Sequence, residues 1–137
     1  MGGKFLVDAS ALYPLVLKLR EKLLEYSSLL VVLDLTLYEV GNVVWKEHRR
    51  GRIRDPTMVA GLFQEIFNII PVQSFNADIS RVLGIAAEEN LTFYDASYLY
   101  TARAQGLKLV TEDQDLQRFP ESISVEQLLK ELGFQAR

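Results

Sequence analysis

Short apolar runs alternate along the chain with longer segments in which apolar residues recur at helical spacing. Residues 5–7 and 29–33 form continuous apolar runs and residues 107–111 (LKLVT) a mainly apolar one, which are typical of strands buried on both faces of a parallel sheet. Residues 71–75 are a weaker strand candidate, and residues 123–132 fit a strand followed by a helix. Strands that alternate with helices predict an α/β fold whose mainly parallel sheet is covered on both faces. The sheet is expected to be small because helices outnumber strands.

The helices are predicted from their apolar spacing and from the residues at their ends. Ser10 is expected to cap the first helix, with Pro14 confined to its first turn. Asp55 and Pro56 give a strong helix start, and Gly106 gives a helix stop. The expected helices run through Leu12 to Leu24, Leu37 to Trp45, Val59 to Phe67, Ile79 to Ala86 with Asn76 or Ser74 as the cap, and Tyr94 to Gln105.

The composition is that of a single globular domain spanning residues 1–137, with 49% hydrophobic and 24% charged residues. The net charge of −3 gives no general attraction to nucleic acid, so any such binding needs a local basic patch. There are no cysteines, which excludes disulfides, thiolate zinc sites and cysteine nucleophiles. No signal peptide and no membrane span of about 20 apolar residues is recognisable, so a soluble, cytoplasmic protein without a membrane partner is expected.

Acidic residues adjoin the ends of several apolar segments. Asp8 closes the first run and Asp113 follows the third, while Glu39 comes shortly after the second. Asp95 opens the helix-like stretch behind Leu91. Ligands of parallel sheets bind outside the carboxyl ends of the strands, so we predict that these acids converge. Converging carboxylates repel one another unless a cation joins them, and hard oxygen ligands suit Mg²⁺ or Mn²⁺. The pattern therefore predicts a divalent-metal site and phosphodiester chemistry, in which metal ions activate water.

Neutral and acidic neighbours have the right offsets to support such a site. Asp115 is a supplementary metal ligand, and Ser10, Asn42 and Thr111 are candidates for orienting the carboxylates or bound waters. The loose spacing leaves a structural interpretation open for each acid. These interpretations are a helix or turn cap for Asp8, a solvated helix face for Glu39, a capping-box partner of Thr92 for Asp95, and turn residues for Asp113 and Asp115.

The segments around the acids, taken in order, resemble the motifs of PIN-domain nucleases. Residues 5–10 (FLVDAS) resemble the first strand of that family, and residues 37–42 (LYEVGN) are similar to its Glu-x-x-Asn helix. Residues 91–98 (LTFYDASY) resemble the third acidic motif, and residues 109–116 (LVTEDQDL) match the Thr-x-Asp motif at a strand end. The length is similar to that of single-domain VapC-type toxins. One departure is Gly41, which stands where bulkier residues are common.

The resemblance implies a three-layer α/β/α sandwich and Mg²⁺- or Mn²⁺-dependent endonucleolysis of RNA, with water as the nucleophile. It implies a homodimer that is inhibited by a small antitoxin of the VapB type. The metal and catalytic roles would fall to Asp8, Glu39, Asp95 and Asp113, with Asp115, Ser10, Asn42 and Thr111 in support.

A concentrated run of basic residues follows the Glu39 helix. It can clamp RNA phosphates near the metal site, or it can complement the dipole of a helix C-terminus and stay solvated. The same choice applies to nearby aromatic residues such as Trp45, which fit base stacking or packing in a core or dimer. The basic residues are Lys46, Arg49, Arg50, Arg52 and Arg54, and His48 lies among them.

Other functional classes fit the sequence less well. A phosphoacceptor receiver domain needs adjacent acids after its first strand, whereas Asp8 stands alone, and Lys108 precedes the last buried run instead of ending it. A phosphatase with an aspartyl nucleophile needs Asp-x-Asp, and the chain has Ser10 at the third position. A housekeeping PIN nuclease in RNA processing and a non-catalytic PIN-like binding module remain alternatives.

Overall fold

The structure, a computed structural model, describes residues 4–134. The expected absence of a signal peptide concerns a segment that includes Met1 to Gly3, which lie outside the described residues. The strands are β1 (Phe5–Val7), β2 (Leu30–Leu33), β3 (Val72–Gln73), β4 (Lys108–Val110) and β5 (Ser122–Ile123). The helices are α1 (Ala9–Leu19), α2 (Leu23–Tyr26), α3 (Asp34–Arg49), α4 (Pro56–Ile69), α5 (Ile79–Glu89), α6 (Phe93–Gln105), α7 (Gln114–Gln117) and α8 (Val125–Leu132), with 3₁₀ turns η1 (Arg20–Lys22) and η2 (Ser27–Leu29).

The strands form one parallel sheet in the order β3-β2-β1-β4-β5. β1 is central, with Leu6 beside Val31 of β2 on one side and Leu109 of β4 on the other. The chain moves from β1 out to β3 and then returns to β4, so the strand order reverses beside β1. Ligands of open parallel sheets bind at such a reversal, outside the carboxyl ends of the strands.

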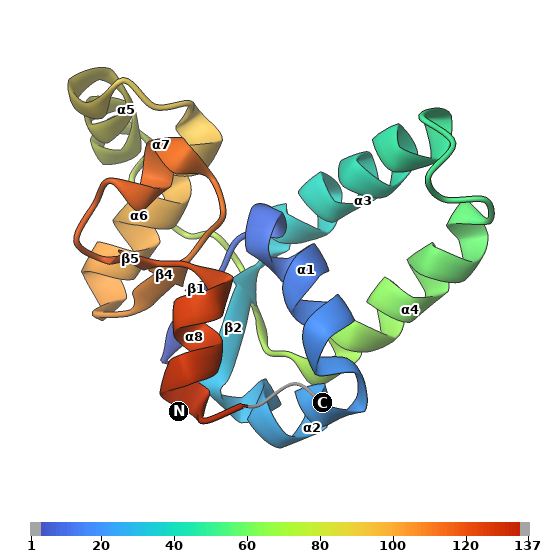
Figure 1. Cartoon of the computed structure of the whole chain (residues 1–137). Coiled ribbons are helices and arrows are strands. Elements are labelled where there is room, and N and C mark those ends of the chain that lie inside the picture. The colour runs from blue at the N-terminus through green and yellow to red at the C-terminus, as the bar shows by residue number, and fades with distance from the viewer. Residues whose placement is uncertain (1–3, 135–137) are drawn as a thin grey trace.

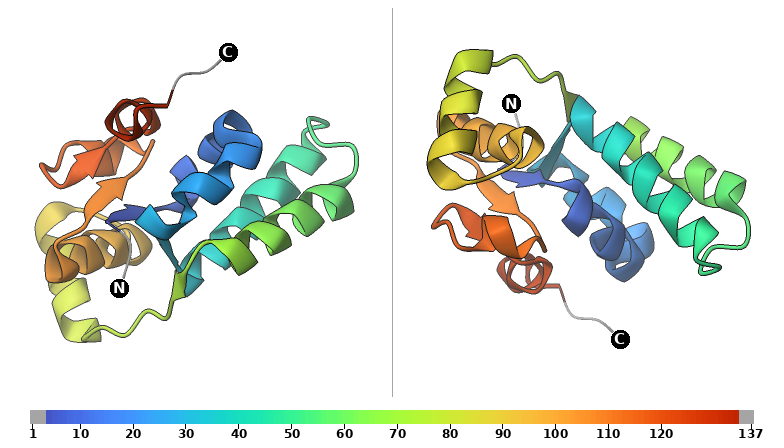
Figure 2. Two further views of the ribbon diagram at one scale, coloured as in Figure 1. Left: turned by 90° about the horizontal axis from the view of Figure 1, so that it is seen from below. Right: turned by 90° about the horizontal axis from the view of Figure 1, so that it is seen from above.

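Alternate residues of the strands enter two separate cores. Phe5, Val7, Leu30, Val32 and Val110 pack with helices α1, α3, α4 and α8 on one face. On the other face Leu6, Val31, Leu33 and Leu109 pack with α6 and α7. The continuous apolar runs arise because both faces of each strand are buried. The views from below and above show α5 and α6 on one side of the sheet and α1, α3 and α4 on the other (Figure 2). This arrangement confirms the predicted α/β/α fold.

The predicted start of the first helix is wrong. Asp8, with extended backbone angles, is the cap, and its carboxylate accepts a hydrogen bond from the Ala11 amide. The helix can therefore begin directly after the strand, and the Ser10 hydroxyl donates to Asp8. Pro14 consequently lies in the second turn and not in the first. The helix ends at Leu19 because Arg20 has a positive φ of 51°, so it is shorter than predicted.

The predicted cap of the helix after residue 75 is also wrong. Asp78 caps α5, since its carboxylate accepts from the Ser80 amide, whereas Ser74 and Asn76 lie in the preceding loop. The start at Asp55-Pro56 and the stop at Gly106, which has a φ of 65°, agree with the sequence. Within residues 4–134 no helix is both long and apolar enough to cross a membrane.

Candidate metal centre

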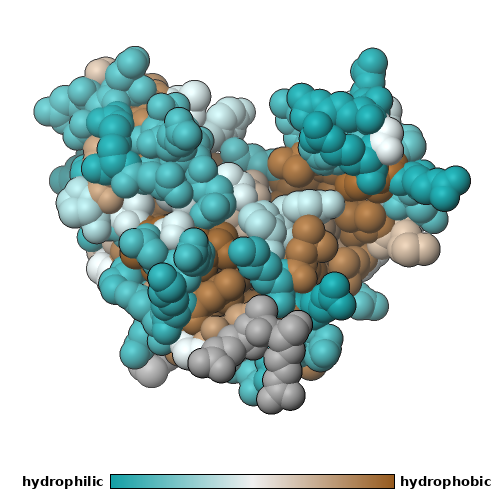
Figure 3. All heavy atoms as spheres, in the orientation of Figure 1, coloured by the Kyte–Doolittle hydropathy of each residue, from teal (hydrophilic) through white to brown (hydrophobic). Residues whose placement is uncertain are grey.

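The carboxyl ends of β1, β2 and β4 lead into α1, α3 and α7 at one end of the sheet. In Figure 1 these starts and the start of α6 lie in the upper half of the molecule, between α5 and the far end of α3. The space-filling view shows a hollow there, between the part formed by α5, α6 and α7 and the part formed by α3 and α4 (Figure 3). Each of the elements α1, α3 and α6 carries one of the predicted acids at its start or in its first two turns, and α7 carries two, Asp113 and Asp115.

Asp8 is the buried member of the group, with 3% of its surface exposed. The Ser10 hydroxyl donates to its Oδ1 at 2.7 Å, and the Ala11 amide donates to the same atom at 3.0 Å. Neither bond engages Oδ2. Burial raises the pKa of Asp8 to about 6, and the negative charge of Glu39 raises it further, while hydrogen bonds from Thr111, Ser10 and Ala11 oppose the rise. Asp8 therefore caps a helix and also contributes buried negative charge.

Asp95, Asp113 and Asp115 form an open cluster. One carboxylate oxygen from each lies within 4.8 Å of the others. Thr92 caps α6 by accepting from the Asp95 amide, which is one half of the expected capping box. The carboxylate of Asp95 lies with the two other acids of this cluster. Burial raises its pKa to about 6, and the charges of Asp113, Glu39 and Asp115 also raise it.

Glu39 completes the set from α3. Burial raises the pKa of Glu39, a hydrogen bond from Tyr98 opposes this rise, and the charge of Asp113 adds to it. The Tyr98 hydroxyl donates to Glu39 Oε1 at 2.6 Å. The charge of Asp113 raises the pKa of Glu39, and the charge of Glu39 raises the pKa values of Asp8 and Asp95. These interactions link the acids into one electrostatic group.

This donor set fits a hard divalent cation. Its ligand atoms are carboxylate oxygens, the type that Mg²⁺ and Mn²⁺ prefer. Within the described part of the chain, no lysine or arginine forms an ion pair with any of these five acids. Like charges held together without a counter-charge destabilise the folded state, and a bound cation removes that cost.

Ser10 and Thr111 connect the loops that carry Asp8 and Asp113. The Ser10 hydroxyl accepts from the Glu112 amide at 2.9 Å and lies 3.3 Å from Thr111 Oγ1. Thr111 Oγ1, which is fully buried, accepts from the Asp113 amide at 3.0 Å. Asn42 is different, because it is exposed and, among residues 4–134, makes no side-chain hydrogen bond to the acids. It lines a surface pocket with Trp45, Lys46, Arg49 and Arg50.

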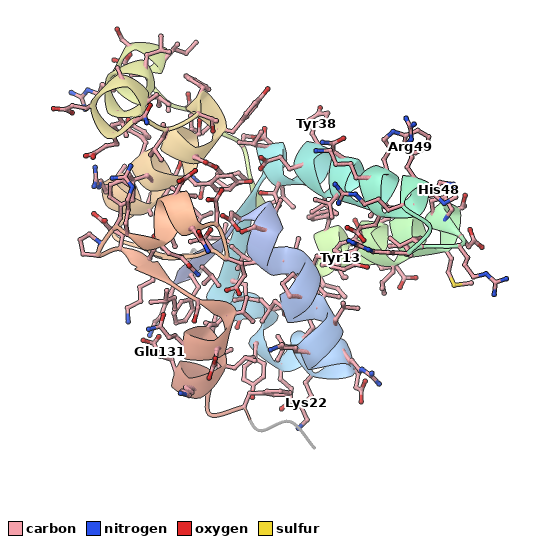
Figure 4. The ribbon with its side chains drawn as sticks, turned by 45° about the horizontal axis from the view of Figure 1, so that its top comes forward. Tyr13, Lys22, Tyr38, His48, Arg49 and Glu131 are labelled. Carbon is pink, nitrogen blue, oxygen red and sulfur yellow. The ribbon has the colours of Figure 1, made fainter. Side chains whose placement is uncertain are left out.

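The basic residues lie toward the far end of α3. Figure 4 shows Tyr38 near the beginning of this helix and His48 and Arg49 near its end. At 1.5 Å per residue, Arg49 lies about 15 Å along the axis from Glu39. The members of the run differ in their partners. Arg52 donates to both carboxylate oxygens of Glu47 at 3.1 and 3.2 Å, Arg50 pairs with Glu47 at 3.6 Å, and the Arg49 guanidinium lies 5.9 Å from the Trp45 ring centroid.

Three polar residues at this end of the sheet escaped the sequence-based prediction. Asp34 directly follows β2, but its Oδ1 accepts from the amides of Leu35 and Phe75, so it ties the β3 loop to the start of α3. Tyr98 and Thr36 are almost fully buried, and their hydroxyl oxygens lie 2.7 Å apart. The available signal for Tyr98 was its position three residues after Asp95, on the same side of one helix.

Comparison with known proteins agrees with this architecture. Residues 5–122 match the model of the PIN domain. The chain is 41% identical over 136 residues to "Exonuclease VapC9" of Pyrobaculum aerophilum, covering 98% of this chain and 100% of that protein. It is 34% identical over 126 residues to "Ribonuclease VapC3" of the same organism, covering 85% of this chain and 95% of that protein.

Solved structures show the same likeness. The crystal structure of PAE2754 from Pyrobaculum aerophilum has a TM-score of 0.88 and 40% identity, covering 98% of this chain and 100% of that one. The DNA-bound VapBC structure from Salmonella typhimurium shares the fold, with a TM-score of 0.67 and 16% identity over 90% of this chain and 98% of that one. From the domain match and the identity to curated relatives, the chain belongs to the PIN-domain family and is a relative of VapC-type nucleases.

Proposed function

We propose that this protein hydrolyses phosphodiester bonds of RNA with a divalent cation, Mg²⁺ or Mn²⁺, held by Asp8, Glu39, Asp95 and Asp113, with Asp115 as an additional ligand. The observation that carries this proposal is the electrostatic coupling of acids from four elements at the end of the sheet. Burial and the charges of neighbouring acids raise the pKa values of Asp8, Glu39 and Asp95, and no basic side chain among the described residues pairs with any of the five acids. A relative's name, "Ribonuclease VapC3", supports RNA as the substrate.

The protein's own residues act by holding charge in place. A divalent cation supplies charge stabilisation for the phosphodiester and activates water for its hydrolysis. Ser10 and Thr111 orient the carboxylates of Asp8 and Asp113 through the hydrogen bonds between their loops. Because the chemistry needs no histidine base, the only histidine has another role: His48 Nδ1 donates to the Ile53 carbonyl at 2.9 Å, at the end of α3.

Cleavage within the strand is the mode that we propose, and the name of the 41% identical relative, "Exonuclease VapC9", supports cleavage from an end as the second candidate. A covalently closed circular RNA separates the two modes. With Mn²⁺ or Mg²⁺, an endonuclease opens the circle, whereas an exonuclease degrades only a linear RNA of the same sequence. The same reactions with a single-stranded DNA circle and with EDTA test the choice of RNA and the metal requirement. Failure to degrade any of these substrates at saturating metal would contradict nuclease activity.

A small antitoxin and a second copy of the chain are the proposed protein partners. Exposed apolar surface supports protein binding: a groove of about 440 Å³ between α3 and α4 is lined by residues that include the exposed Leu37 and Trp45 and the half-buried Phe67. Figure 3 shows hydrophobic surface where α1, α3 and α4 lie side by side. Co-expression with the product of a short reading frame beside the gene, followed by mass determination in solution, tests both partners. A monomer that does not bind this product would contradict them.

A further inference from the structure

A buried series of hydrogen bonds leads to Glu39 of the candidate metal centre. Tyr98, which is 1% exposed, donates from its hydroxyl to Glu39 Oε1 at 2.6 Å. The Thr36 hydroxyl oxygen, which is fully buried, lies 2.7 Å from the same tyrosine oxygen. A tyrosine hydroxyl has one hydrogen, and here Glu39 receives it. Thr36 is therefore the donor in the second bond, and the series runs from Thr36 through Tyr98 to Glu39.

This series of hydrogen bonds joins the helices that carry two of the acids. Thr36 and Glu39 are three residues apart on α3, and Asp95 and Tyr98 are three residues apart on α6. Residues at this spacing are neighbours on one side of a helix. The tyrosine thus spans from the Asp95 helix to the Glu39 side chain, which is the longest and most flexible of the proposed ligands.

The hydroxyl group and the ring of Tyr98 have separable roles. The ring packs in the core with Leu6, Leu33 and Leu99, and a phenylalanine ring would fill the same space. The hydroxyl adds nothing to that packing, and its hydrogen-bond partners among residues 4–134 are Thr36 and Glu39. A buried tyrosine hydroxyl needs an acceptor, and here that acceptor is a carboxylate of the candidate metal centre.

We propose that Tyr98, held by Thr36, is a positioning residue that fixes the Glu39 carboxylate for metal binding. This inference rests on the proposed function, because it needs Glu39 to be a ligand. Partners that orient metal ligands from outside the coordination sphere change metal affinity by about 10- to 100-fold when they are removed. We expect the loss of the Tyr98 hydroxyl to weaken binding at the lower end of this range.

The test is titration of the full chain with Mn²⁺ by calorimetry at pH 7.5, with circular dichroism of each variant as the check of folding. Tyr98→Phe should raise the Kd for Mn²⁺ about 10-fold, and Glu39→Gln should raise it further. Tyr13→Phe is the matched control and should leave the Kd unchanged. It removes the hydroxyl of a tyrosine, labelled in Figure 4, whose ring stacks on that of Phe63 of α4 with ring centroids 5.8 Å apart. Should Tyr98→Phe not fold, Thr36→Val and Thr36→Ser decide, since only the valine variant loses the donor to Tyr98.

The outcomes separate this inference from the proposed function. If Glu39→Gln binds Mn²⁺ more weakly, two results would overturn the positioning role alone. One is an unchanged Kd in folded Tyr98→Phe, and the other is equal Kd values for Thr36→Val and Thr36→Ser. An unchanged Kd in Glu39→Gln would remove Glu39 from the proposed site, and the positioning role with it. Weaker binding in Tyr98→Phe and in Glu39→Gln, with a normal Tyr13→Phe, supports the inference.

Discussion

The carboxylates of Asp95 and Asp113 lie within 4.8 Å of each other, although one belongs to the first turn of α6 and the other caps α7. The charge of Asp113 is the second cause, after burial, of the raised pKa of Asp95. Two like charges at this distance are unfavourable in the metal-free fold, so the sequence retains them at a cost in stability. Such a cost is expected at a site that binds a cation.

Asp95→Asn should abolish RNA cleavage while leaving the fold intact. The amide removes one charge from the cluster, so we expect activity to fall by more than about 100-fold, the upper end of the effect of outer-shell partners. The metal-free melting temperature should not fall, because repulsion with Asp113 and Glu39 is relieved. The matched control is Asp78→Asn, which keeps a good cap for α5 on the surface and should keep full activity. Cleavage by Asp95→Asn at the wild-type rate would exclude this residue from the mechanism.

The stability of the metal-free protein should fall as the pH rises. Folded Asp8 holds its proton more tightly than the unfolded chain, because its pKa is raised from 3.8 to about 6. Its contribution to stability is therefore fully present below pH 3.8 and is lost as the pH rises through about 6. This rise in the pKa of Asp8 corresponds to about 3 kcal/mol of stability. Denaturant unfolding of the EDTA-treated protein between pH 4 and pH 7.5 measures this loss, and Asp8→Asn should reduce it to the part that Asp95 and Glu39, whose pKa values are also raised, contribute. A free energy of unfolding that does not change over this range would contradict the assignment.

Metal should restore stability only where the acids are ionised. Protons and cations compete for the same oxygens, so Mn²⁺ should raise the melting temperature clearly at pH 7.5 and little at pH 5, below the raised pKa values of Asp8 and Asp95. Thermal denaturation with Mn²⁺ and with EDTA at both values tests this directly. Equal increments at pH 5 and pH 7.5 would show that the ion binds elsewhere.

Two arginines at the end of α3 should differ in their effect on RNA binding. Arg52 is held by both oxygens of Glu47, whereas Arg49 lies against Trp45 in the pocket that Asn42 also lines. Arg49→Ala should weaken RNA binding and lower the slope of log Kd against log salt by about one unit. Arg52→Ala should weaken binding less. These binding measurements are best made with the inactive Asp95→Asn protein. Equal effects of both substitutions would contradict a specific role of Arg49.

Much of the fold follows from local sequence patterns. The apolar runs that became β1, β2 and β4 were recognisable because strands buried on both faces contain few polar residues. Helix starts were less predictable, since several residues near each start can act as the cap. Asp8 and Asp78 became the caps because their own backbone is extended and their carboxylates reach free amides in the first turn of the helix. That choice depends on where tertiary packing begins the helix.

The site was only partly accessible to the same reasoning. Strand ends led to Asp8 and Asp113 because the carboxyl ends of parallel strands meet at one edge of the sheet. The same rule did not distinguish Asp34 from the proposed ligands. The Asp34 carboxylate accepts hydrogen bonds from the amide of the next residue, Leu35, and from the amide of Phe75 in a distant loop. The bond between Tyr98 and Glu39 joins residues 59 positions apart, and only the packing of two helices brings them together.

The most direct test of the shared cation site is a crystal structure with Mn²⁺, recorded at a wavelength that gives its anomalous signal. The account predicts an anomalous peak at about 2.0–2.6 Å, the distance range of hard divalent cations, from carboxylate oxygens of at least two of Asp8, Glu39, Asp95 and Asp113. Crystals grown at saturating Mn²⁺ that show no peak among these oxygens would contradict it.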